Sequence, residues 1–541
     1  SSPHNRSTIY HAGNVIFKSM DNGNSWDIIS PDLTRNDKSK QGPGSGPYTN
    51  EAAGGENYNT IMYLVESPHE KGVLWAGSDD GLIHLTKDGG LNWTNVTPPN
   101  LKEGIVNSIE VSPHVPGTAY VVVMRYKQMD LKPYIFKTSD YGTTWYNITN
   151  GITGEHTFVR VVREDKRKKG LLYAGTETGL FISLDDGQNW QPFQLNLPIV
   201  PINDLIIQDN DLVAATAGRS FWILDDLAAI QNMDSPKKPI SIYKPKDTYL
   251  IFGGHTDKPV PGLGQNPKSG VTFDYYLDTD ADSLDLKLEV LHKGKTIRTY
   301  TNKKPKDFKS WPGGPSKPET LPSKKGFNRF TWDFRKENLP AVDKVFVYGS
   351  YAGSRVGPGT YKLKLTVDGL TSETEVTVMK NPKVEGTTAD YEEQQTVLGH
   401  IEGGIKSIHE SVTSMLSAKA QLKSYAELLK GTDKAEKLLE KGKSLIERIE
   451  TWEGKLIQPK QKTFQDVINF NNRLNAEFME LKSYVDVAEP KVTQGAKERL
   501  KDLMAEWKTY ENERNAIVND EMEAYNKLYN DLGLPAIILN E

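Results

Sequence analysis

The feature that most constrains this chain is a short motif that recurs four times within its first 190 residues. Each copy begins with Ser or Thr and continues with Asp, Gly and Trp at fixed distances, and successive copies start 67, 52 and 45 residues apart. A chain with such self-similarity is predicted to fold as a row of repeated units. The motif residues are Ser19, Asp21, Gly23 and Trp26; Thr86, Asp88, Gly90 and Trp93; Thr138, Asp140, Gly142 and Trp145; and Ser183, Asp185, Gly187 and Trp190.

The residue types of this motif, which we call the Asp box, indicate a structural role. A hydroxyl and a carboxylate two residues apart can bond backbone N–H groups inside a hairpin. The glycine permits a positive φ, and the tryptophan can pack the hairpin onto a sheet. We therefore predict that the Asp boxes hold hairpins together rather than bind metal or catalyse a reaction.

The segments between the Asp boxes repeat as well. Apolar stretches at residues 9–13, 74–77, 119–122 and 172–175 precede the boxes, and three of them follow a Ser-Pro-His sequence. Earlier apolar strands are predicted at residues 60–65 and 106–111. Each unit thus reads as four antiparallel strands, which is the pattern of one β-propeller blade. A fifth unit, residues 202–226, keeps the strands but has lost the box.

The first unit begins at Ser2, Pro3 and His4. In the other units the equivalent residues follow the innermost strand, so the innermost strand of the first unit should lie before Ser2. A blade is not expected to leave its inner edge unpaired. We therefore expect further blades, from upstream sequence of the same polypeptide or from a cleaved fragment, to complete the propeller.

Two further domains are predicted after the blades, which occupy residues 1–234. Residues 235–386 show alternating strands separated by Pro/Gly turns, the pattern of an immunoglobulin-like or fibronectin-III-like β-sandwich. Residues 387–541 show helical periodicity with breaks near residues 431, 458 and 489, which predicts a C-terminal four-helix bundle. The overall fold class is therefore mainly β with an α C-terminus.

Aromatic side chains of the helical domain are assigned to two roles. Most are predicted to fill its core: Trp452, Phe464, Phe470, Phe478 and Trp507. Trp507 is also considered as an exposed anchor for a partner protein, together with Tyr510 and Tyr525, because aromatic residues dominate interface energies. The alternative to such a docking module is that the helical domain closes on itself as a self-contained cap.

Composition excludes several classes of function. The net charge is −5 and basic residues are not clustered apart from acidic ones, so no nucleic-acid partner is expected. No apolar run approaches the length of a membrane span. The chain has no cysteine, which excludes disulfides, thiol catalysis and Cys-based zinc sites. We expect no metal and no cofactor.

Together with the boxes, residues 30–34, 172–179 and 218–225 carry a resemblance to a known group of proteins. The chain resembles the large exported bacterial proteins, common in Bacteroidota, that are labelled sortilin-like or BNR-repeat "glycosyl hydrolase". The resemblance implies a C-terminal part of a longer protein that is secreted, periplasmic or attached to the outer membrane or cell surface. The hydrolase label of that group rests on the Asp box alone.

Three functions remain open. The first is binding of a peptide, protein or glycan, since the long loop at residues 35–59 is rich in the Gly, Tyr and Asn that recognition loops use, and sortilin-type propellers capture polypeptides. The second is a glycoside hydrolase with facing carboxylates, for which Asp79, Asp80 and Glu177 are candidates. The third is a purely structural part of a surface assembly. Candidate ligand-binding residues are Tyr48, Glu56, Asn57, Tyr58, Arg125, Arg160, Glu177 and Arg219.

A sialidase is not predicted. That chemistry needs an arginine triad, whereas Arg125, Arg160 and Arg219 fall on different predicted blades, and the entry motif of those enzymes is absent.

Overall fold

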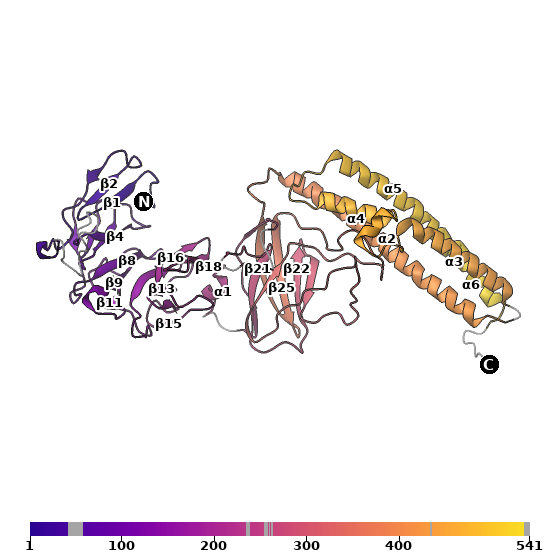
Figure 1. Cartoon of the computed structure of the whole chain (residues 1–541), viewed down its shortest axis with the longest axis horizontal. Helices are drawn as coiled ribbons and strands as arrows, with labels where there is room; N and C mark the ends of the chain where they lie inside the picture. The colour runs from indigo at the N-terminus through magenta and orange to yellow at the C-terminus, as the bar shows by residue number, and fades with distance from the viewer. Residues whose placement is uncertain are drawn as a thin grey trace. The chain divides into compact units, whose positions relative to one another are not determined.

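The computed structural model describes residues 1–41, 58–233, 238–253, 258, 260, 263–432 and 435–534. The chain divides into two compact units, Ser1–Ser235 and Pro236–Glu541 (Figure 1). The first consists mainly of β-sheets, and the second combines β-sheets with a C-terminal helical region. The predicted division at residue 386 lies inside the second unit and stays a prediction.

Within its described residues, the first unit contains five antiparallel sheets, which we call blades one to five, and in each of them the strands follow chain order. Blade one has three strands: β1 (Ile9–Ala12), β2 (Ile16–Ser19) and β3 (Asp27–Ile28). Blade two has β4 (Ile61–Glu66), β5 (Leu74–Ser78), β6 (Ile83–Thr86) and β7 (Thr94–Asn95). Blade three has β8 (Ile105–Val111), β9 (Ala119–Met124), β10 (Ile135–Thr138) and β11 (Tyr146–Asn147).

Blades four and five complete the row. Blade four has β12 (Val159–Glu164), β13 (Leu172–Thr176), β14 (Gly179–Ser183) and β15 (Gln191–Pro192). Blade five has β16 (Ile202–Gln208), β17 (Asp211–Thr216) and β18 (Phe221–Leu224), followed by the short helix α1 (Ala228–Gln231). The first strands β4, β8, β12 and β16 pack against one another in succession, and buried side chains of neighbouring blades form shared cores.

Each Asp box ties its hairpin together with the same bonds. In blade one, Ser19 Oγ donates to Asp21 Oδ1 at 2.7 Å and accepts the Gly23 N–H at 2.8 Å. Asp21 in turn accepts the Ser25 N–H at 2.9 Å. The hydroxyls and carboxylates of the other three boxes repeat these bonds within 0.2 Å. The carboxylates are thereby directed at the backbone of their own hairpins.

The tryptophans of three boxes reach the preceding blade. Trp93 Nε1 donates to the Ile29 carbonyl at 2.8 Å, and Trp145 Nε1 donates to the Val96 carbonyl at 2.8 Å. Trp190 Nε1 donates to the Ile148 carbonyl at 2.6 Å. We call this contact the tryptophan clasp, because it joins one blade to the blade before it.

Histidines of the Ser-Pro-His sequences join each blade to the one that follows. The Nε2 atoms of His4, His69 and His114 lie 2.8, 3.1 and 2.6 Å from the carbonyl oxygens of Ser67, Ser112 and Asp165. The sequence pattern of this motif indicates only how the repeats align. The structure gives it a contact between blades.

In the part of the second unit that the structure describes, the β region consists of two sheets. One has the order β19 (Ile240–Ile242), β21 (Val271–Leu277), β24 (Gly326–Trp332). The other has the order β20 (Thr248–Tyr249), β26 (Leu370–Met379), β25 (Gly359–Val367), β22 (Leu286–His292), β23 (Lys295–Thr301). Their buried side chains form one core that includes Phe273, Tyr275 and Trp332. The specific immunoglobulin or fibronectin-III assignment stays a prediction.

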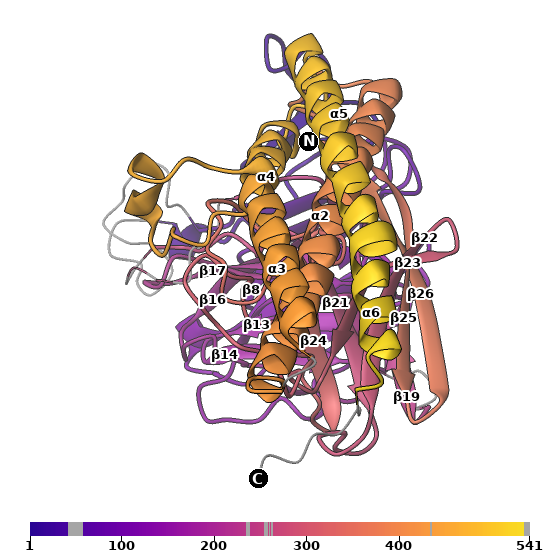
Figure 2. The ribbon, with the colours of Figure 1, turned by 90° about the vertical axis from the view of Figure 1, so that its right-hand side faces the viewer.

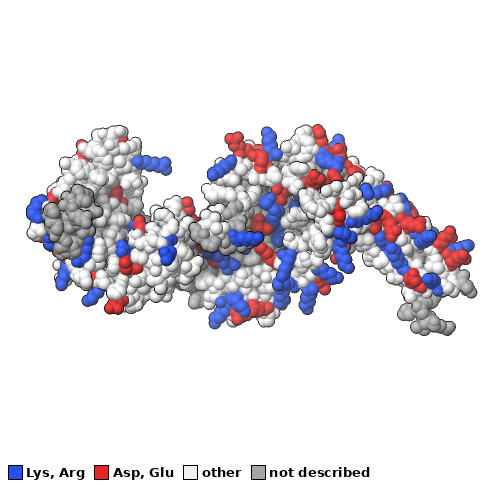
Figure 3. Space-filling view, in the orientation of Figure 1, with Lys and Arg blue, Asp and Glu red and all other residues white. Residues whose placement is uncertain are grey.

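The helical region contains α2 (Thr388–Leu428), α3 (Glu436–Leu456), α4 (Leu474–Val485), α5 (Gln494–Ala516) and α6 (Glu523–Asp531), with a π-helical turn, η4 (Ile517–Met522), between the last two. These helices lie side by side (Figure 2). Basic and acidic side chains alternate over their exposed surface (Figure 3), and several form ion pairs, as Lys455 does with Glu513. Among the described residues, none of the helices combines the length and the apolar character that a membrane crossing requires.

The core of the helical region corrects two expectations. Trp452, Phe478 and Trp507 are buried and Phe470 is half-buried, but the Phe464 side chain is 62% exposed. Phe464 lies in a 3-10 segment, η3 (Phe464–Ile468), outside the packed helices, with its ring 4.8 Å from that of Tyr348.

The second correction concerns the proposed anchors. Trp507 and Tyr525 are buried, because the helix surface that carries them faces the other helices, and the Tyr525 ring lies against Gly442 of α3. Tyr510 is half-buried, and its backbone carbonyl accepts the Trp452 indole N–H at 2.8 Å. These rings hold the helices together, so they do not offer an exposed docking face.

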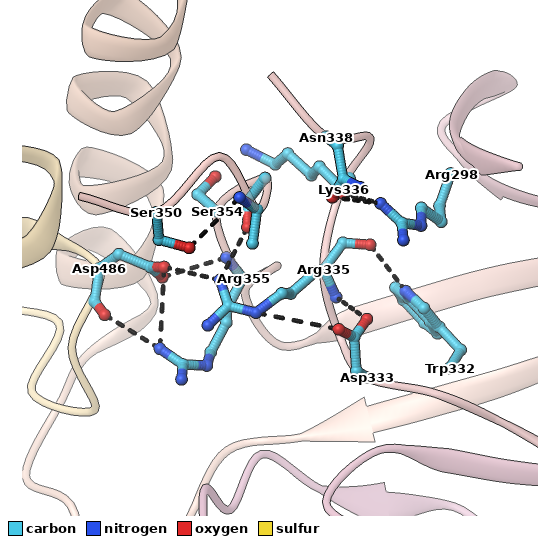
Figure 4. A network of polar contacts seen from close by, with 12 residues as sticks. Arg298, Trp332, Asp333, Arg335, Lys336, Asn338, Ser350, Ser354, Arg355 and Asp486 are labelled. Carbon is cyan, nitrogen blue, oxygen red and sulfur yellow. Dashed lines mark hydrogen bonds and ion pairs between the residues drawn. The ribbon is translucent and has the colours of Figure 1, made fainter. Parts of the chain in front are cut away.

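A charged network joins the helices to the sheets within the second unit (Figure 4). Asp486, at the end of α4, accepts hydrogen bonds from the Arg335 guanidinium at 3.1 Å and from the Arg355 N–H at 3.0 Å. The buried Lys482 donates to the Ala352 carbonyl at 2.7 Å. Burial lowers the pKa of Lys482, while Asp486 opposes that shift.

Candidate functional site

The predicted ligand-binding residues are placed by the blades at one end of the sheets. At this end, which we call the rim, the first strands begin and the second strands of the blades end. Arg125, Glu177 and Arg219 follow second strands, and Tyr58 and Arg160 lie at the start of first strands. The common position follows from the repeat, because equivalent residues of successive blades lie at equivalent heights. Tyr48, Glu56 and Asn57 lie outside the described residues.

Blades two and three meet at the rim around Glu103. Its carboxylate accepts hydrogen bonds from the Tyr58 hydroxyl and from Lys40 Nζ, the latter at 2.7 Å, and its carbonyl accepts the Arg125 Nε–H at 3.0 Å. Tyr58 is 2% exposed, and burial together with Glu103 raises the pKa of its hydroxyl. Tyr58 therefore belongs to the wall of the rim. Glu103 was missed because nothing in its sequence surroundings marks it.

Blades three and four meet at Arg160. Arg160 Nε donates to Glu177 Oε2 at 2.6 Å, and its guanidinium lies 5.3 Å from the centre of the Phe158 ring. The Arg160 carbonyl accepts from Asn107 at 2.6 Å. Two residues proposed separately from the sequence are thus one ion pair. Arg219 lies apart on blade five, exposed, and donates to the carbonyl of its neighbour Gly218 at 2.9 Å.

The two aspartates considered for hydrolysis differ in environment. Asp80 is fully buried and accepts hydrogen bonds from Ser78, Asn59 and the Arg35 N–H. Asp79 accepts the N–H groups of Asn59 and Thr60 at 3.0 and 2.9 Å. Burial raises the pKa of Asp79 to about 6. Asp80 is thus held by hydrogen bonds inside the structure, whereas the Asp79 carboxyl keeps its proton to a higher pH than an ordinary aspartate does.

An exposed apolar side chain stands at the tip of a turn on this rim. The Met129 side chain is 87% exposed, and its backbone has φ 57°, the left-handed conformation. The turn is closed by an ion pair between Arg125 and Asp130 and by hydrogen bonds from the Gln128 and Asp130 N–H groups to the Arg125 carbonyl. Next to it, Tyr126 stacks on Phe158 with ring centres 5.7 Å apart.

Among the described residues, no cluster of three or more His, Asp or Glu side chains is arranged to hold a metal ion. The rim therefore offers paired charges, aromatic rings and one presented methionine.

The chain matches no protein-family model and no curated protein. Among solved structures, YCF48 bound to D1 peptide is 17% identical, with 39% of this chain and 58% of that chain covered and a TM-score of 0.26. The GH74 xyloglucanase from Xanthomonas campestris is 14% identical, with 71% and 65% covered and a TM-score of 0.32. The extracellular domain of a one-component system from B. thetaiotaomicron is 10% identical, with 51% and 32% covered and a TM-score of 0.29.

The chain spans less than two thirds of the length of these three proteins. At TM-scores this low the likeness carries no argument about ligand or reaction, so the function is argued from the rim itself.

Proposed function

We propose that this chain is part of an exported or cell-surface β-propeller protein of the sortilin-like type, which binds a peptide or protein at the rim and works within a larger assembly that includes further blades. The observation that carries the proposal is Met129. Methionine in the left-handed conformation costs about 1–2 kcal/mol relative to the right-handed one. Residues held in this conformation cluster at functional sites, and here the conformation presents a large apolar side chain to solvent.

The surroundings of Met129 favour a polypeptide ligand. Methionine adapts to different apolar partners, and aromatic residues and Met are enriched at protein interfaces. The neighbouring charges Arg125 and Asp130 neutralise each other, and so do Arg160 and Glu177. Such a rim can bind extended apolar segments without burying an unpaired charge.

Selection of random peptides displayed on phage tests this proposal. We expect peptides that bind the chain to lose at least about ten-fold in affinity on Met129→Asp. Met20, which is 60% exposed on a blade-one hairpin, supplies the matched control, and Met20→Asp should leave binding unchanged. Peptides that bind both variants and the unaltered chain equally would overturn the assignment. Glycans that bind on an array and are lost on Met129→Asp would change the ligand class to carbohydrate.

A glycoside hydrolase is the second candidate, and the raised pKa of Asp79 favours it, because the general acid of such an enzyme is a carboxylic acid whose pKa is raised above its ordinary value. The other candidate carboxylates are engaged, Asp80 in buried hydrogen bonds and Glu177 with Arg160. Release of reducing ends from a panel of polysaccharides, lost on Asp79→Asn, would establish this activity. The binding proposal expects no such release.

A further inference from the structure

Strand β1 of blade one is paired on one side only. It pairs with β2, and among the described residues no strand lies along its other edge. In the next three blades the equivalent strands β5, β9 and β13 each lie between two partners. An open edge of this kind presents a row of backbone N–H and C=O groups that can pair with another strand.

A slot of about 560 Å³ runs beside this edge. One wall is formed by Tyr10, His11 and Ala12 of β1, and the other by the whole length of β4. The first strands of blades two to five pack in succession. The slot therefore occupies the place that one more first strand, packed against β4, would fill. At the rim end a hydrogen bond from the Ile61 N–H to the Gly13 carbonyl, 2.8 Å long, closes it.

The turn that ends a first strand is already formed in blade one. The Ser2 N–H donates to the Thr8 carbonyl at 2.9 Å. The equivalent bonds of the next three blades measure 2.8, 3.0 and 2.8 Å and run from Ser67, Ser112 and Asp165. In those blades the residue just before the turn pairs with the first residue of the second strand, as Val111 does with Ala119. Ser1 is thereby set in register opposite Ile9.

We propose that β1 accepts an added antiparallel strand, which fills the slot and runs toward Ser1. We assign the strand to polypeptide outside these 541 residues, since the first strands among the described residues, β4, β8, β12 and β16, are each paired within their own blades. This inference goes beyond binding at the rim and does not depend on it. It is the β-augmentation mode of peptide recognition, in which main-chain bonds give affinity and alternate side chains give specificity.

The repeat specifies the chemistry of that strand. Two positions three residues apart are apolar in every first strand, and the pairs are Ile61 and Leu64, Val106 and Ile109, Val159 and Val162, and Ile202 and Leu205. In β8 both side chains of the pair are fully buried. The occupant is therefore an extended segment with β-branched or aliphatic residues at these two positions, the second of them opposite His11.

Two arms test the strand site on the 541-residue chain. In the first, a peptide with the sequence of residues 104–110 is added, and hydrogen exchange is followed at the β1 amides that do not pair with β2. In the second, the same seven residues are fused directly before Ser1, which restores the register seen in β8. The control in both arms carries Val106→Asp and Ile109→Asp within the added segment.

We expect the fused segment to slow exchange in β1 at least about ten-fold and to raise the thermal midpoint, whereas the control segment does neither. The fused chain should also no longer respond to added peptide. The result with the fused chain is decisive for the strand site, because fusion raises the effective concentration of a strand that binds weakly. If exchange in β1 and the midpoint stay unchanged in the fused chain, the strand site is wrong. Protection by the fused segment upholds it, even where free peptide binds too weakly to protect. Loss of peptide binding at Met129 leaves both readouts unaffected, so the two proposals fail separately.

Discussion

Blade one and the three blades that follow carry the same Asp box, yet their tryptophans behave differently. Trp190 is 5% exposed and donates to the preceding blade, whereas Trp26 is 42% exposed and donates to the Gly23 carbonyl of its own hairpin at 3.1 Å. The bonds of the serine or threonine and the aspartate are the same in both places. The box therefore combines two kinds of contact: hydrogen bonds that close within the hairpin, and a tryptophan contact that forms only against a neighbouring blade.

The largest expected effect is a difference in stability between variants that lack the buried and the exposed tryptophan. Trp190→Ala should destabilise the first unit by about 3–5 kcal/mol, because it removes a buried indole and its bond between blades. Trp26→Ala should cost about 1 kcal/mol or less, since half of the ring is already in water. Urea unfolding followed by circular dichroism measures both. Equal losses would show that the preceding blade contributes nothing to the clasp.

The box glycines sharpen the same contrast. Gly90 and Gly23 have φ of +106° and +94°, so alanine is strained at either position by about 1–2 kcal/mol. At Gly90 an added Cβ would also lie 2.5 Å from the Ile29 carbonyl oxygen, whereas at Gly23 the nearest atom is a flexible Ile9 methyl at 3.3 Å. We expect Gly90→Ala to cost about 1–3 kcal/mol more than Gly23→Ala in the same unfolding measurement.

The histidine contacts should not distinguish the blades. His4 and His69 both reach a carbonyl of the following blade, so each alanine variant should lose about 0.5–1.5 kcal/mol. Thermal unfolding of His4→Ala and His69→Ala side by side measures this. A much smaller loss for His4→Ala would mean that blade one is loosely attached on both sides, and the comparison would then no longer isolate the tryptophan.

The smallest expected effect is a loss of stability at acid pH that Asp21 of blade one and Asp88 of blade two cause equally. Hydrogen bonds within the hairpin lower the pKa of Asp21 and of Asp88 from 3.8 to about 2. A carboxyl with a lowered folded pKa contributes stability that is complete above the unfolded value and disappears as the pH falls through about 2. Asp21→Asn and Asp88→Asn should therefore flatten the acid side of the midpoint-against-pH curve equally. A steeper change for Asp88 would tie the carboxylate to the neighbouring blade as well.

Local pattern made much of this fold predictable. The box spacing and the alternating apolar residues placed the first and second strands of blades two and three, and the second strand of blade four, close to their observed bounds. Phe464 was misjudged because an aromatic residue between two helices has the same local sequence signature whether it packs inward or lies on a connecting turn.

The rim was less accessible to sequence reasoning. Arg160 and Glu177 were each proposed, but their pairing depends on the β-bulge at the start of β12, which displaces Arg160 from the ladder. Aligning Glu177 with Asp79 in the repeat could have indicated a common rim. Met129 had no signal at all, since only the backbone shows that this residue adopts a left-handed conformation.

The acceptor of each tryptophan clasp is a backbone carbonyl, at Ile29, Val96 and Ile148. Every amino acid provides that group, so the residue at the accepting position can change over generations without breaking the bond. A duplicated blade inserted into the row would find its acceptor already present. Repeats joined in this way can be gained, lost or exchanged during evolution with little need for compensating substitutions in their neighbours.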